Sequence, residues 1–178
     1  MTSLDCSDRS RKFFRLLRVT AILFGAGLLA GVSCGGSTEA SPPGVAGLDE
    51  QFEYDTLVIE ADDGQAHTFK VYLATSRDQQ RQGLMFIRSL PDDVGMLFIY
   101  KESAVHSMWM KNTYVPLDIV FATGDGAIAT VIRDTTPLSL ESLSSGVPVR
   151  YVLELKAGTT RRLSIGKKSR LIWRGAAD

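Results

Sequence analysis

The sequence predicts a mainly β domain, an antiparallel barrel or sandwich with one or two short helices. Short apolar segments with alternating polar residues recur between residues 53 and 174, as expected of strands that bury one face. Turn-forming sequences separate these segments, and the clearest is Thr123-Gly124-Asp125-Gly126. A segment of about 120 residues is also long enough to bury one hydrophobic core.

Eight segments are predicted to be strands. The first two are separated by Asp62-Asp63-Gly64 and should form a hairpin. The strands are expected over 54–61, 67–74, 96–100, 105–110, 117–122, 127–132, 150–155 and 169–173.

Two short helical segments are expected between the strands. Thr75 can cap a helix whose first turn contains Asp78, and Gly83 can end it. A second helical turn is predicted over 158–163. The serine-rich segment 137–146 is predicted to be a solvated surface loop.

Composition excludes several classes of protein. The chain has 178 residues with 20 basic and 20 acidic side chains, so its formal net charge is zero. A nucleic-acid-binding domain of this size usually carries a basic excess, and we predict no nucleic-acid partner. Two cysteines form neither a disulfide scaffold nor a C-x-x-C metal knuckle. We therefore predict no cofactor and no metal site.

The N-terminus is typical of an exported lipoprotein. Five basic residues within 9–18 precede an apolar stretch over 19–32, which is too short to span a bilayer comfortably as a helix. Small residues then precede Cys34. We predict a lipoprotein signal peptide over 1–33, with acyl chains on Cys34 anchoring the chain to a membrane. The alternatives are cleavage without lipidation and an uncleaved anchor.

The segment after Cys34 is rich in Gly, Ser, Pro and Ala, and we predict a flexible tether over 34–52. The folded domain is then expected over 53–174. Removal of residues 1–33 would leave 15 basic and 18 acidic residues, a net charge of about −3. The predicted location is the cell envelope, on the periplasmic or outer surface.

Three motifs of the predicted domain resemble those of a known family. They are Gly83-Leu84-Met85 with Arg88, Gly95-Met96-Leu97-Phe98, and Trp109-Met110-Lys111-Asn112-Thr113 followed by Pro116-Leu117-Asp118-Ile119. Together with Tyr151-Val152-Leu153-Glu154, they resemble the bacterial and archaeal family known as domain of unknown function 192. The resemblance covers roughly 67–173 and implies a compact, mostly β domain. It implies no reaction.

Polar residues within these motifs are the candidate ligand-binding residues. An acid among apolar neighbours must be hydrogen-bonded, paired with a cation or exposed. Asp118 is such an acid, and its expected partners are Arg88, Arg81 and Lys111. Glu154 has a similar setting, but Asp118 is the stronger candidate. The predicted site comprises Arg88, Trp109, Lys111, Asn112 and Asp118, gathered at one rim of the domain.

Each of these residues also has a purely structural interpretation. Trp109 or Met110 can fill the core, Asn112 can shape a turn, and Asp118 can form a structural ion pair. On a strand, Trp109 and Lys111 would share one side while Met110 and Asn112 share the other.

The predicted function is a membrane-anchored envelope lipoprotein whose β domain binds a small ligand or another envelope component. One alternative is an enzyme of unassigned reaction that uses Asp118, Lys111 and Arg88. A less favoured alternative is a copper-handling protein, because thioethers and imidazole suit Cu(I). Its candidate ligands are Met85, Met96, Met108, Met110 and His106.

Overall fold

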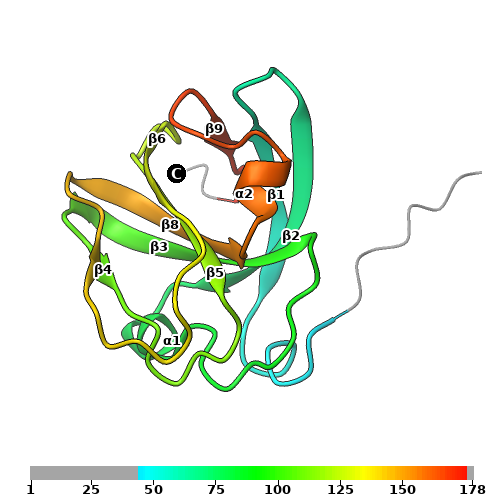
Figure 1. The fold of residues 1–178 in the computed structure, drawn as a ribbon, viewed down its shortest axis with the longest axis vertical. Helices are drawn as coiled ribbons and strands as arrows, with labels where there is room; N and C mark the ends of the chain where they lie inside the picture. Colours follow the sequence, from blue (N-terminus) through cyan, green and yellow to red (C-terminus); the bar gives the residue numbers. More distant parts are fainter. Residues whose placement is uncertain (1–43, 176–178) are drawn as a thin grey trace, which may run out of the picture. The chain divides into compact units, whose positions relative to one another are not determined.

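The computed structural model describes residues 44–175, which form a mainly β domain as predicted (Figure 1). A seven-stranded sheet curls into a half-barrel. Its strands in chain order are β1 (Tyr54–Glu60), β2 (Ala66–Ala74), β3 (Val94–Ala104), β5 (Leu117–Ala122), β6 (Ile128–Ile132), β8 (Val149–Lys156) and β9 (Arg170–Ile172). A separate pair consists of β4 (Ser107–Met108) and β7 (Leu143–Ser144).

The strand order in the large sheet is β6-β5-β8-β3-β2-β1-β9. All neighbours are antiparallel except β2 and β3, which are parallel and connected through α1 (Arg77–Gln82). The two outer strands also approach each other, because an isolated bridge joins Ala127, just before β6, to Arg170 of β9. This bridge brings the edges of the curled sheet together at one point.

Alternation along the strands divides the apolar residues between the two faces of the sheet. The inner core collects residues from all seven strands, including Leu57, Phe69, Leu97, Val120 and Leu153. The outer core covers the other face of the central strands with residues such as Met96, Phe98, Ile119 and Val152. Loop residues and α1 cover this outer core. A pocket remains between α1 and the sheet.

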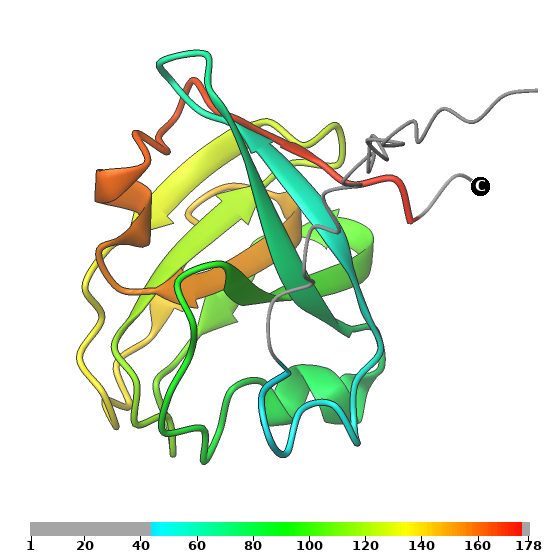
Figure 2. The ribbon, with the colours of Figure 1, turned by 90° about the vertical axis from the view of Figure 1, so that its right-hand side faces the viewer.

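The helix α1 forms where the sequence predicts a helix, but its N-cap is Ser76 rather than Thr75, and Ser76 forms a capping box with Gln79. The Ser76 hydroxyl accepts a hydrogen bond from the Gln79 amide, and the Gln79 side chain accepts one from the Ser76 amide. Gly83 ends the helix at a φ of 49°. The second helix, α2 (Thr159–Arg162), matches the helical turn expected over 158–163. Figure 2 shows α1 and α2 in different parts of the domain.

The folded part begins earlier than the sequence suggests. Val45, Leu48 and Phe52 fall within the predicted tether, yet they belong to the outer core, and Leu48 is only 1% exposed. The Tyr72 hydroxyl accepts a hydrogen bond from the Val45 amide and donates one to Asp49. The predicted tether over 34–52 therefore extends too far, because its last residues bury apolar side chains in the folded domain. The signal peptide and Cys34 lie outside the described residues.

Two further differences concern the small β pair. The strand expected over 96–100 is longer, because β3 extends from Val94 to Ala104, and the strand expected over 105–110 is reduced to the two residues of β4. The serine-rich loop contains β7, which pairs with β4, so this part is not simply solvated surface. Ser145 is buried, its hydroxyl accepts a hydrogen bond from the His106 amide, and its amide donates to the His106 carbonyl.

Candidate functional site

The candidate site is a small pocket between α1 and the outer face of the sheet. It has a volume of about 90 Å³. Gln80 to Met85 form one side, Phe98 and Tyr100 come from β3, Met108 to Lys111 supply three residues of another side, and Glu154 comes from β8. The pocket thus joins the motif segments that the sequence singles out.

Glu154 is the acid of this pocket. Its side chain is on the same face of the sheet as Met96 and Ile119, its cross-strand neighbours on β3 and β5. The residue is 4% exposed, and its Oε2 atom has no hydrogen-bond partner among the described residues. Burial raises the pKa of Glu154 to about 8. At neutral pH the side chain is therefore mostly a neutral carboxylic acid.

Glycine 83 lies directly beside this carboxyl group. A Cβ atom at this position would be 4.0 Å from Glu154 Oε2 and 3.2 Å from the Phe98 ring. The positive φ of Gly83 also disfavours any other residue. The glycine therefore allows the end of α1 to pass close to the acid without covering it with a side chain.

Tyr100 and His106 form an aromatic stack at the β3 side of the pocket. Their ring centroids are 3.5 Å apart, with 15° between the ring planes. Burial, together with the nearby charge of Glu154, raises the pKa of Tyr100 to about 12. Burial lowers the pKa of His106. Both side chains are thus neutral at neutral pH, and Tyr100, the one of the two that lines the pocket, presents a polar but uncharged group to it.

Cations and an aromatic ring line the other side of the pocket. The Lys111 Nζ atom lies 5.1 Å from the centre of the Trp109 ring. Trp109 and Lys111 are exposed and Met110 is buried, although residues 109–112 lie in a loop and turn after β4 and not on a strand. Arg81 of α1 is exposed and also lines the pocket. An acid at the base and cations at the side give the pocket two chemically different ends.

The other predicted site residues are placed differently. Asn112 lies next to the pocket, with its carbonyl accepting a hydrogen bond from the Phe86 amide and its Nδ2 atom 3.9 Å from Met85 Sδ. Arg88 stacks on the ring of Tyr114 at 4.5 Å and does not line the pocket. Neither residue touches Asp118 through a hydrogen bond or ion pair among the described residues.

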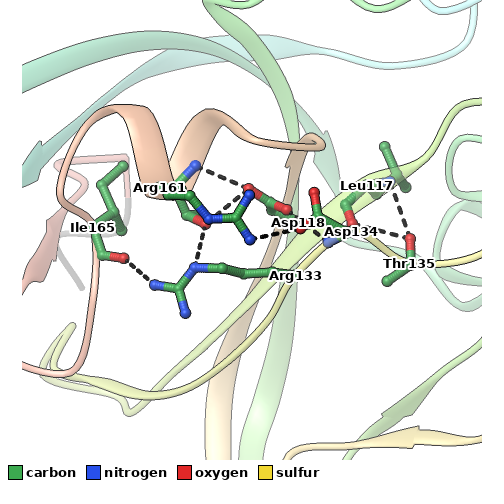
Figure 3. Close-up of polar contacts among 8 residues, drawn as sticks. Leu117, Asp118, Arg133, Asp134, Thr135, Arg161 and Ile165 are labelled. Atoms are coloured by element: carbon green, nitrogen blue, oxygen red, sulfur yellow. Dashed lines mark hydrogen bonds and ion pairs between the residues drawn. The ribbon is translucent and has the colours of Figure 1, made fainter.

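Asp118 is not part of this pocket, and the single rim expected from the sequence is not formed. Its side chain points to the inner face of the sheet and is fully buried. Asp118 Oδ2 accepts hydrogen bonds from the Thr160 amide at 2.9 Å and the Thr160 hydroxyl at 2.7 Å, and Oδ1 accepts one from the Asp134 amide at 3.0 Å (Figure 3). The expected partners Arg88, Arg81 and Lys111 are replaced by these groups.

The position of α2 explains what Asp118 does. Gly158 is the N-cap of α2 and has no side chain that could accept from the helix amides. Asp118 supplies the missing acceptor from β5. Arg133 completes the arrangement in Figure 3 by donating to the Thr160 hydroxyl and to the Ile165 carbonyl. This is a structural role in which the acid is fully hydrogen-bonded.

A larger cavity of about 260 Å³ opens on the inner side of the sheet, lined by residues that include Leu57, Leu97, Tyr151 and Trp173. The Trp173 indole donates to Asp55, so this side chain already has its partner. We regard the smaller pocket as the candidate site because it contains a buried acid without a partner.

Two other structural observations bear on the alternatives. Among residues 44–175, no three His, Cys, Asp or Glu side chains converge as a metal site would require. Met85 and Met108 line the pocket, while Met96 and Met110 are buried in the outer core.

The same part of the chain contains no helix with the length and apolar character needed to cross a membrane.

The comparisons with known proteins agree with this architecture. A crystal structure of a Sinorhizobium meliloti 1021 protein, provisionally described as a transcription regulator, is 40% identical. The match covers 68% of this chain and 94% of that one, with a TM-score of 0.67. A Novosphingobium aromaticivorans protein of unknown function is 30% identical over 76% of this chain and 95% of that one, with a TM-score of 0.69.

The comparison with curated proteins gives no match. Residues 58–173 match the family described as DUF192, Uncharacterized ACR. This range contains all three motifs, the pocket acid Glu154 and the α2-capping acid Asp118. The chain belongs to the DUF192 family.

Proposed function

We propose that this protein is a membrane-anchored binding protein whose pocket beneath α1 holds a small polar ligand. The observation that carries the proposal is Glu154 Oε2, a buried carboxyl oxygen without a hydrogen-bond partner among the described residues. An unsatisfied buried polar group costs about 1–3 kcal/mol of stability. Such a cost is expected where a ligand supplies the missing hydrogen bond.

The protonation state of Glu154 defines the chemistry of the ligand. A neutral carboxylic acid has one O–H donor and an acceptor oxygen, so it can form paired hydrogen bonds with an amide or a carboxylic acid. Arg81 and Lys111 on the other side favour a ligand with an anionic group. With a volume of about 90 Å³, the pocket takes a small group and not a nucleotide or a large cofactor.

Native mass spectrometry of the mature protein, isolated with whatever small molecule it retains, tests this proposal. The wild-type protein should carry an additional small mass that Glu154→Met abolishes. The same substitution at the exposed Glu60 is the matched control and should retain the mass. If both variants keep the additional mass, or if both lose it, Glu154 is not the group that holds the ligand.

The anchor is the second part of the proposal. It is supported by the basic segment within 9–18, the apolar stretch over 19–32 and the small residues before Cys34. Acylation of Cys34 would place the domain at a membrane surface of the cell envelope. Export of this kind also suits a binding protein that collects a small molecule or an envelope component.

We do not propose an enzyme that uses Asp118, Lys111 and Arg88 together. Asp118 is on the inner face of the sheet, with Thr160 and Asp134 as its partners, while Lys111 lines the pocket on the outer face. No structural observation favours copper binding by the methionines, and that alternative stays a sequence-based hypothesis.

A further inference from the structure

Large apolar side chains are exposed on three neighbouring loops at the end of the domain that carries α1. We call this surface the loop end and define it as residues 84–90, 109–114 and 138–140. Phe86 is 62% exposed and Trp109 is 46% exposed. The other exposed members are Tyr114, Leu138 and Leu140. Five such side chains on one surface are characteristic of an interaction site.

Backbone hydrogen bonds join the three loops into one surface. The Phe86 amide donates to the Asn112 carbonyl at 2.8 Å, and the Leu138 amide donates to the Thr113 carbonyl at 3.1 Å. The Met110 amide donates to the Ser139 carbonyl at 3.0 Å. The exposed side chains are therefore held in fixed relative positions.

Backbone strain is concentrated at the same place. Phe86, Asn112 and Leu138 have φ angles of 67°, 55° and 63°. Asparagine tolerates this left-handed region, but for phenylalanine and leucine the cost is roughly 1–2 kcal/mol each. Strained residues that persist in a fold often serve binding. Here the two strained bulky residues are also among the most exposed apolar ones.

The charge of the loop end is positive. Its sequence contains Arg88 and Lys111 and no Asp or Glu, although the chain after Cys34 is net acidic. Both cations lie on aromatic rings of this surface, Arg88 on Tyr114 and Lys111 on Trp109. Aromatic rings beside Lys and Arg are the side chains that settle into the headgroup region of an anionic bilayer.

The chain enters the domain beside this surface. Residues 44–52 pack against α1, where Gln82 Nε2 donates to Gln51 Oε1 at 2.6 Å. Figure 2 shows this first segment, in cyan, beside α1 at the lower end of the domain. Gly44 is ten positions after Cys34, so the covalent chain between them reaches at most about 35 Å. An anchor at Cys34 would therefore hold this end of the domain near the bilayer.

We infer that the loop end docks on the anionic lipid surface that holds the Cys34 anchor. Phe86, Trp109, Leu138 and Leu140 enter the headgroup region, while Arg88, which does not line the pocket, binds lipid phosphate. The inference rests on the anchor of the proposed function. A lipid surface is favoured over a protein partner because Arg88 and Lys111 lie on the exposed aromatic rings of this surface and because the tether is short.

The two tryptophans of the chain allow a direct test. Trp173→Phe leaves Trp109 as the only reporter on the loop end, and Trp109→Phe leaves Trp173. Each mature protein is reconstituted in vesicles of phosphatidylglycerol and phosphatidylcholine brominated on its acyl chains. Fluorescence of Trp109 should be quenched severalfold and shifted to the blue, whereas fluorescence of Trp173 should stay unchanged.

A second arm separates docking from anchoring. A chain that begins at residue 35, and so lacks both the signal peptide and Cys34, carries Trp173→Phe and is added to the same vesicles at increasing lipid concentration. Quenching of Trp109 in this arm supports docking even if wild-type protein proves not to be acylated. If wild-type protein floats with the vesicles but Trp109 is quenched in neither arm, the anchor holds and docking is overturned. The occupant of the loop end would then be a protein.

Glycine substitutions connect docking to the strained residues. Phe86→Gly and Leu138→Gly remove an apolar side chain and relieve the positive φ, so each should lower quenching while the melting temperature stays the same or rises. Ser164→Gly is the matched control, because Ser164 has a φ of 54° near α2 and away from the loop end. This control should not change quenching. Equal quenching in all three variants would contradict the inference.

Discussion

Glu154 and Asp118 lie on adjacent strands, one register position apart, and point to opposite faces of the sheet. Glu154 is opposite Ile119, and Asp118 is opposite Leu155. Asp118 reaches α2 on the inner face and is fully hydrogen-bonded, whereas Glu154 Oε2 faces the pocket and has no partner among the described residues. Two acids in similar sequence settings thus have different roles.

Asp118→Asn should destabilise the domain by about 2–4 kcal/mol. Asparagine cannot accept the hydrogen bonds from the Thr160 amide and hydroxyl and the Asp134 amide equally well, and hydrogen bonds to a charged acceptor contribute about 1.5–3 kcal/mol each. Urea unfolding measures the change. Asp92→Asn is the control, because Asp92 forms only exposed ion pairs with Lys156 and Arg162 and should change stability by less than about 1 kcal/mol. Equal effects would refute the capping role of Asp118.

Stability should depend on pH through Glu154. Its pKa is about 8 in the folded protein and near 4.5 when unfolded, so the folded state holds a proton that the unfolded state releases between these values. The free energy of unfolding should therefore fall by up to about 1.4 kcal/mol per pH unit as pH rises through this range. Glu154→Gln should remove this slope. Denaturant unfolding of both proteins at several pH values provides the comparison, and parallel curves would show that the Glu154 pKa is not raised.

A chain that begins at residue 53 should be less stable than one that begins at residue 44. The longer chain retains Val45, Leu48 and Phe52 in the outer core. Leu48→Ala in the full chain should cost about 2–5 kcal/mol for the same reason. Exposed Val147 is the matched site, where truncation to Ala should have little effect. Thermal unfolding measures all four, and equal melting temperatures for the two chain lengths would mean that this segment does not stabilise the fold.

Gly95→Ala should be strongly destabilising. A Cβ atom there would lie 2.6 Å from the Glu154 carbonyl oxygen, which belongs to the backbone of the adjacent strand. The strands must separate to accept it, at a cost of at least about 2 kcal/mol. Gly124→Ala is the control, because its nearest contact would be an ordinary 3.6 Å. Chemical denaturation should show a loss only for Gly95→Ala.

Cys34 should carry the fatty acids. Metabolic labelling with a fatty acid is expected to mark the wild-type protein and Cys6→Ala, because Cys6 belongs to the segment removed with the signal peptide. Cys34→Ala should remain unlabelled and should accumulate at its unprocessed length. Labelling of Cys34→Ala at the wild-type level would exclude this residue as the lipidation site.

The sequence predicts the large elements well because local patterns specify them. Strand β5 agrees residue for residue with the expected 117–122, and the turn before β6 is where Gly124 and Gly126 suggest. It does not predict the parallel pairing of β2 with β3 or the β4–β7 pair, since both depend on contacts between distant segments. Burial of Leu48 was also missed, because its neighbours resemble a linker.

In the candidate site, too, the sequence predicts what local patterns specify but not what depends on contacts between distant strands. Trp109 and Lys111 are exposed and Met110 is buried, but residues 109–112 form no strand, so this is not the strand alternation that the sequence suggests. Alternation also does not reveal which face of the sheet receives Asp118. The register with β8 was the missing information. In the pairing of β5 with β8, Asp118 is opposite Leu155 and Glu154 is opposite Ile119, so the two acids point to opposite faces of the sheet. Without this pairing, their sequence settings look alike.

The bridge between Ala127 and Arg170 has a consequence for molecules crowded on one surface. Exposed strand edges can recruit strands from neighbouring copies and start aggregation. In the described part of the chain, the Leu171 amide donates to the Gly126 carbonyl and the Ile128 amide donates to the Ser169 carbonyl, so the two outer edges occupy each other. A single short strand near the C-terminus thereby shields β1 along part of its length and the start of β6 at once. Loss of residues 170–172 would expose both, and the protein would become most prone to self-association where its copies are held closest together.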